Sequence, residues 1–128
     1  MMPDRYLGIK PDGSLFWILT DNDHRVDHFH KFIRCNWLEN VYTKLPDIAI
    51  IVDEVGKVKQ DPQPFNLLAS MLYRGSEFGD FIHGPVIVAG IHETPDGDDW
   101  FPPTVPELLC VQRVLGVDLS TAKEWKNA

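Results

Sequence analysis

One apolar run near the middle of the chain restricts the fold more than any other stretch. Residues 86–91 carry hydrophobic or small side chains at both alternating sets of positions, so a strand formed here is expected to be covered on both faces. Gly84 and Pro85 stand at its entry, where a bend and a missing backbone donor are tolerated. We therefore expect a bent strand, with residues 81–83 before the kink and an acidic loop, residues 93–99, after it.

Shorter patterns around this run predict both strands and helices. Their order lacks a strand–helix–strand rhythm, which favours an α+β fold, a mostly antiparallel sheet with about three helices packed on it in a single domain. The length of 128 residues suits one core. The expected strands are 6–9, 14–20, 37–45 and 48–52, the first two forming a hairpin. The expected helices are 24–35, 65–73, 105–115 and a short last one at 121–125.

Helical periodicity predicts which side chains face the core. Thr104 and Glu107 have the spacing of a capping box at the start of the third helix, and Ser120 is the expected cap of the last one. Cys110, in the middle of the third helix, is expected to be a buried thiol. The side chains expected to point inward are Val26, Phe29, Phe32, Ile33, Phe65, Leu68, Met71, Leu72, Val105, Leu108, Leu109 and Val114.

The negative net charge of the chain favours some classes of binding partner over others. With 12 Lys and Arg against 19 Asp and Glu, the net charge is -7, which disfavours direct nucleic-acid binding and suits either a basic protein surface or ordinary solubility. The two cysteines form no disulfide framework. Since no signal peptide and no membrane-length apolar run is visible, we expect a cytoplasmic protein that does not contact membranes.

A histidine-rich segment is the densest polar cluster. On a helix, His24 and His28 share a face with Asp27 beside them, a spacing that could hold a zinc ion. The glutamate of the H-E-x-x-H motif is absent, however, so the metalloprotease interpretation fails. The alternative is a solvated helix face, which we favour, and we assign no metal and no cofactor.

Two further histidines flank the central strand. His83 and His92, with Asp80, could form an acid–base group at one end of the sheet, because the pKa of histidine lies near neutrality. No serine or cysteine occupies a recognisable nucleophile turn. Structural roles at a bulge and at a strand end are therefore favoured, and no catalytic residue is assigned.

The acidic loop is the candidate binding surface. Its carboxylates do not have the spacing of a calcium-binding EF-hand, so we interpret them as a docking surface for a basic partner. The adjacent aromatic residues would serve as interface contacts; the alternative is that both pack into the core. The predicted binding residues are Glu93, Asp96, Asp98, Asp99, Trp100 and Phe101.

Three ordered motifs carry a resemblance to a known family. Residues 45–57 (LPDIAIIVDEVGK), 64–69 (PFNLLA) and 79–90 (GDFIHGPVIVAG) resemble, in order and spacing, the family called domain of unknown function 3846. We place the family-like core at about residues 36–116, with the N-terminal hairpin and first helix (1–35) outside it. The resemblance implies a small accessory protein of a phage or mobile element and no assigned activity.

These observations favour a non-catalytic protein that binds and modulates a host protein, as an inhibitor of a host defence system would, through the acidic surface. The alternatives are a small metal-dependent enzyme and a module that binds a nucleotide or another small ligand. An exposed strand edge would also allow a homodimer.

Overall fold

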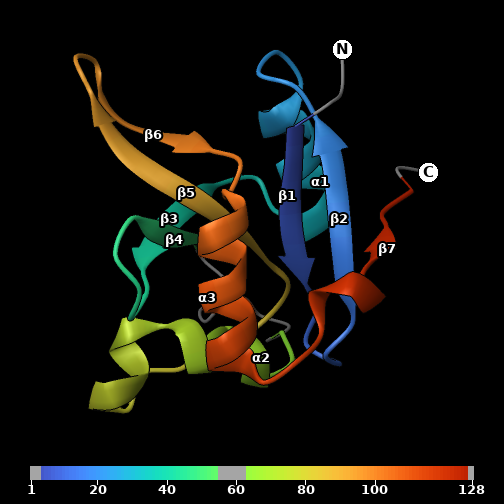
Figure 1. Cartoon of the computed structure of the whole chain (residues 1–128), viewed down its shortest axis with the longest axis vertical. Helices are drawn as coiled ribbons and strands as arrows, with labels where there is room; N and C mark the ends of the chain where they lie inside the picture. The colour runs from blue at the N-terminus through green and yellow to red at the C-terminus, as the bar shows by residue number, and fades with distance from the viewer. Residues whose placement is uncertain (1–3, 55–62, 127–128) are drawn as a thin grey trace.

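One open, mostly antiparallel sheet organises this α+β fold (Figure 1). The computed structural model describes residues 4–54 and 63–126. Within these residues seven strands pair in the order β3-β4-β5-β1-β2-β7, with β6 added to β5, and every pairing except β2 with β7 is antiparallel. The strands are β1 (Asp4–Ile9), β2 (Leu15–Thr20), β3 (Leu38–Tyr42), β4 (Ile48–Asp53), β5 (Val86–Thr94), β6 (Gly97–Phe101) and β7 (Lys123–Glu124).

Helices cover both faces of this sheet. Figure 1 shows α3 in front of the strands and α1 behind them, with α2 at the lower end. The expected α+β class is therefore confirmed. The helices are α1 (Arg25–Ile33), α2 (Leu67–Leu72) and α3 (Val105–Leu115), with short 3-10 turns η1 (Arg74–Phe78) and η2 (Leu119–Thr121).

The central strand contributes to two separate hydrophobic clusters, one on each face of the sheet. Val86 and Val88 pack with side chains of α2 and α3. Ile87 and Ala89 pack on the other face, with Phe29 and its neighbours from α1. All four β5 side chains are fully buried, which confirms the expectation of a strand covered on both faces.

The segment before this strand is not a strand, contrary to expectation. Residues 81–83 contribute only an isolated bridge between Phe65 and His83. Gly84 adopts a left-handed backbone with φ of 84°, which turns the chain before β5 begins. The backbone of Ile82 bonds to Asn66 and to the Ser70 hydroxyl instead of to a neighbouring strand.

The buried side chain of Asn66 joins three parts of the fold. Its Nδ2 donates to the carbonyl of Ile9 at the end of β1 (3.2 Å) and to that of Gly84 (2.8 Å). Its Oδ1 accepts from the Ala69 N–H (3.1 Å) and caps α2. Because Asn66 is the cap, α2 begins at Leu67, two residues later than expected.

Several helical side chains expected in the core are exposed. Phe65 lies ahead of α2, and on α3 the buried stripe is Leu108, Val111 and Leu115, at spacings of three and four residues. Cys110 therefore faces away from this stripe and is exposed. The side chains wrongly expected to point inward are Val26, Phe65, Val105 and Leu109. The capping box of Thr104 and Glu107 is confirmed.

The expected acidic loop is a β-hairpin. Residues 93–99 lie within β5, its turn and β6, where Glu93 pairs with Asp98 and His92 with Asp99. Aspartate and glycine have low strand propensity, so the sequence of β6 does not indicate a strand.

The chain end also differs from the expected last helix. Asp118 caps the short η2, and Lys123–Glu124 forms β7 beside β2. The expected turn after β4 runs into residues 55–57, which lie outside the described residues. Among the residues described, no helix has the length and apolar character needed to cross a membrane.

Replacing Asn66 with Ala should destabilise the fold. The change removes the cap of α2 and leaves the carbonyls of Ile9 and Gly84 without their buried donor, for an expected loss of about 2–4 kcal/mol. Chemical denaturation measures this loss. The control is Asn22→Ala, because Asn22 is exposed in a turn. A loss for Asn66→Ala no larger than that of the control would show that these bonds do not support the fold.

Candidate binding site at the β5–β6 hairpin

The second half of β5 continues beyond its neighbours in the sheet. Its pairing with β4 ends at Ile48 and Gly90, and its pairing with β1 ends at Leu7 and Val88. Within the described part of the chain, residues 92–94 pair only with β6. Figure 1 shows the resulting two-stranded hairpin extending away from the body of the molecule.

Arg25, at the start of α1, holds the base of this hairpin. Its Nη2 lies 2.7 Å from Asp99 Oδ1, and its Nη1 donates to the carbonyl of Trp100 and, at 3.4 Å, to the Tyr6 hydroxyl. The guanidinium side chain is largely covered, whereas that of Asp99 is about half exposed (14% and 49% accessible). Burial alone would lower the pKa of Arg25, but its hydrogen bond to Tyr6 and the charge of Asp99 raise it overall.

The predicted binding residues divide into an inner and an outer group. Asp99 forms the ion pair with Arg25, and Trp100 is partly buried against Phe29, with ring centroids 5.8 Å apart. Phe101 is 38% exposed. Glu93 and Asp96 are exposed near the tip. The backbone of Asp98 pairs in the hairpin, but its side chain is outside what the structure describes.

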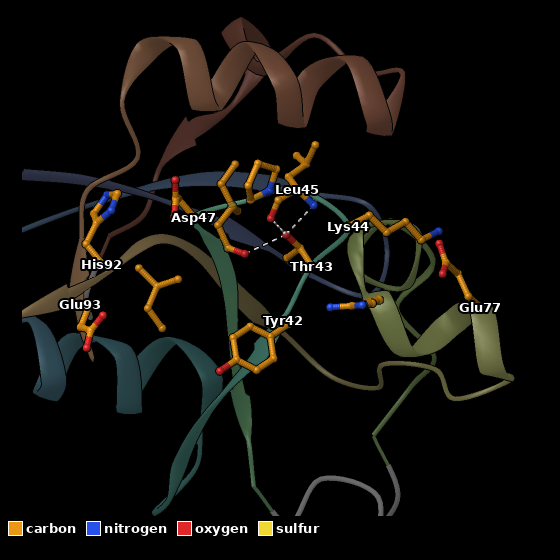
Figure 2. A pocket seen from close by; sticks show the side chains of 12 residues that line it. Tyr42, Thr43, Lys44, Leu45, Asp47, Glu77, His92 and Glu93 are labelled. Atoms are coloured by element: carbon orange, nitrogen blue, oxygen red, sulfur yellow. Dashed lines mark hydrogen bonds between the residues drawn. The ribbon is translucent and has the colours of Figure 1, made fainter. Parts of the chain in front are cut away.

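A hollow of about 660 Å³ lies beside the hairpin. Figure 2 shows His92, Glu93 and Asp47 on one side of it and Lys44 and Glu77 on the opposite side, with the ring of Tyr42 between them. Its size falls within the range of about 300–1,000 Å³ that is usual for ligand pockets. The lining residues are Tyr42, Thr43, Lys44, Leu45, Pro46, Asp47, Ile48, Arg74, Glu77, Ile91, His92 and Glu93.

The segment that connects β3 and β4 forms one wall of the hollow, and hydrogen bonds fix its backbone. The buried Thr43 Oγ1 lies 2.8 Å from the Ile48 carbonyl and 3.0 Å from that of Leu45. Asp47 has a left-handed backbone with φ of 60°, which is uncommon for a residue other than glycine. Its carbonyl accepts from the Ile91 N–H at 2.9 Å.

Sequence reasoning identified only part of this hollow. It singled out His92 and Glu93, but not Tyr42, Lys44 or the 3-10 turn η1 that supplies Arg74 and Glu77. These residues come from separate segments that only the tertiary fold brings together. The one local signal is the Pro46-Asp47 turn.

The candidate zinc ligands have other partners. The rings of His24 and His28 lie side by side, with centroids 6.2 Å apart. His24 Nδ1 is 2.8 Å from Asp21 Oδ1, and His28 Nδ1 is 2.6 Å from Thr20 Oγ1. Across residues 4–54 and 63–126, no group of three or more His, Cys, Asp and Glu side chains is arranged to hold a metal ion.

The candidate acid–base group is not assembled in the described contacts. His83 Nδ1 lies 3.2 Å from the Gln63 carbonyl. His92 packs against Phe101, with ring centroids 5.4 Å apart. The carboxylate of Asp80 accepts a hydrogen bond of 2.8 Å from the Tyr73 hydroxyl. Each of the three side chains therefore has a different neighbour.

The model of the family described as "Domain of unknown function (DUF3846)" matches residues 7–102. The chain belongs to this family. Searches of curated proteins and of solved structures find no match.

The family match has different limits from those expected. It includes residues 7–9 of β1, all of β2 and α1, which the expected limits left outside, and it ends before α3 begins at Val105. The structure also shows what two of its motifs do together. Asn66 of the PFNLLA motif bonds to Gly84 of the GDFIHGPVIVAG motif, so the two segments form one packed unit ahead of β5.

Replacing Arg25 with Gln should loosen the hairpin more than the rest of the fold. The change removes the charged partner of Asp99, so we expect faster amide hydrogen exchange in residues 97–101. Mass spectrometry of exchanged peptides measures this rate. Arg113→Gln, at an exposed position of α3, is the control. Unchanged exchange in β6 would contradict a bracing role for Arg25.

The ionisation of His24 should depend on Asp21. The hydrogen bond that the His24 ring donates to Asp21, followed by the negative charge of Asp21, raises the pKa of His24, while the same bond lowers the pKa of Asp21. The stabilisation from charged His24 is therefore present below the unfolded pKa of His24 while Asp21 stays ionised, and it is lost as the pH rises through the folded pKa of His24 or falls through that of Asp21. Asp21→Asn should lower the pKa of His24 measured by NMR titration.

The matched control for this titration is Asp23→Asn, because Asp23 acts on His24 only through a smaller charge effect. Equal downward shifts of the His24 pKa in the two variants would contradict the assigned pair.

Proposed function

We propose that this protein is a non-catalytic accessory protein of a phage or mobile element that binds a host protein and modulates its activity. Inhibition of a host defence system is the specific form of modulation that we favour. The protein would act in the host cytoplasm, through a basic surface of its partner, without direct contact with nucleic acid or membrane. A homodimer is compatible with this role.

The projecting β5–β6 hairpin is the observation that carries this proposal. Residues 93–99 contain four acidic residues and no basic one. Arg25 balances Asp99 at the base, whereas Glu93 and Asp96 are exposed farther out. A braced element that presents like charges is suited to steering and docking an oppositely charged protein.

Exposed aromatic character supports protein binding at the same place. The ring of Phe101 lies next to that of His92 on the hairpin, and Tyr42, 63% exposed, lines the adjacent hollow. Aromatic side chains are enriched at the centres of protein interfaces, whereas the rim is polar.

The first test is a tagged pull-down from host lysate, washed at low and at high salt, with bound proteins identified by mass spectrometry. We expect one stoichiometric partner that is lost at high salt, because salt screens exposed charges. The absence of any partner at either salt concentration would contradict the proposal.

Charge reversal at the hairpin tip should weaken binding to that partner. The variant Glu93→Lys with Asp96→Lys places like charges against a basic surface, so we expect roughly tenfold or greater loss of affinity and a weaker salt dependence. Titration calorimetry at two salt concentrations measures both effects.

The control for net charge is Asp23→Lys with Glu39→Lys, which changes the total charge equally at exposed positions of the α1 turn and β3. If both double variants lose the same affinity, the effect belongs to overall charge and the hairpin is not the docking element.

A further inference from the structure

The edge of β5 that faces the hollow is open where β4 ends. The Ile91 N–H donates to Asp47, the residue just before β4. Alternate residues of a strand direct their backbone groups to the same side, so the N–H and carbonyl of Glu93 face the hollow as well. Within the described residues, no strand pairs with this edge beyond Gly90.

The opposite edge of the same segment is occupied. His92 pairs with Asp99 and Thr94 with Gly97 in β6. Residues 92–94 therefore form a strand that is paired on one side only. A strand advances roughly 3.3 Å per residue, so these residues offer an edge of about 10 Å to another chain.

The turn at Asp47 leaves room beside this edge. Its left-handed backbone follows Pro46, and the hollow lies between residues 42–48 and residues 91–93. An incoming strand can thus lie next to Glu93, in line with β4, and contact the exposed ring of Tyr42.

The charges around the open edge indicate the sign of the incoming side chains. Figure 2 shows the carboxylates of Asp47 and Glu93 on the hairpin side of the hollow, and Lys44 on the far side with Glu77 beside it. Arg74, from the same turn as Glu77, also lines the hollow. The edge itself is therefore bordered by acidic groups, and a basic side chain on the added strand would be complementary to them.

We propose that an extended segment of the partner, carrying basic side chains, adds to the β5 edge at Glu93 as an additional strand. This rests on the proposed function and specifies the kind of segment recognised. Backbone hydrogen bonds to Glu93 supply affinity, and the carboxylates of Asp47 and Glu93 select the side chains.

A capped, fluorescently labelled peptide of alternating valine and lysine residues is the probe. Fluorescence anisotropy measures its binding to the full chain with Glu93→Ala and with Glu93→Pro. Alanine removes only the carboxylate, whereas proline also removes the N–H that faces the hollow. Proline is tolerated at a position whose N–H faces away from the paired strand, so β6 should remain in place.

We expect saturable binding to the unaltered chain, a few-fold weakening with Glu93→Ala, and a further loss of roughly tenfold with Glu93→Pro. A second probe has the same sequence with every backbone nitrogen methylated, so neither of its edges can donate hydrogen bonds, and it should not bind the unaltered chain. This probe keeps the test valid if the proline variant fails to fold. Equal binding of the two peptides, or no binding of either, would overturn strand addition.

The outcome is separable from that of the proposed function. If the captured host protein depends on the hairpin charges but binds Glu93→Pro as well as Glu93→Ala, strand addition is overturned and the proposed function stands. If the peptide binds as expected but no host protein is captured, the proposed function fails and the edge remains a peptide site.

Discussion

The hydrogen bonds of the buried Asn66 side chain are the constraint on which the rest of the structure depends. They join the end of β1, the turn at Gly84 and the start of α2. The turn at Gly84 sets where β5 begins, and the start of β5 sets its register with β1 and β4. Because β5 extends beyond the ends of its pairing with β4 and β1, that register also determines how far the hairpin projects.

The charged residues of the hairpin have two different environments. Asp99 forms an ion pair with Arg25, which fixes the hairpin to α1. Arg25 also donates to the Tyr6 hydroxyl, which connects α1 to the sheet. Burial raises the pKa of that hydroxyl, against the lowering effect of Arg25 beside it. Glu93 and Asp96 are exposed, and in the proposed function they meet the partner. A rigid base and an exposed tip suit recognition, because little ordering is needed on binding.

Much of the fold could be predicted from the sequence, because burial imposes a periodic pattern. Val86 to Ala89 indicated a strand covered on both faces, and Thr104 with Glu107 indicated the start of α3. The hairpin could not be predicted in this way, since Asp98 and Asp99 disfavour a strand locally and are held in one by pairing with β5. The hollow depends on Tyr42, Glu77 and Glu93 meeting from distant segments, which no local pattern encodes.

The central claim is that the hairpin and the hollow beside it form the docking surface. Hydrogen exchange of the chain alone and in complex with its captured partner tests this claim most directly. The account predicts that protection on binding is concentrated in residues 91–101 and 42–48. Protection confined to the exposed aromatic face around Phe65, Phe78 and Phe81, with the hairpin unchanged, would contradict it.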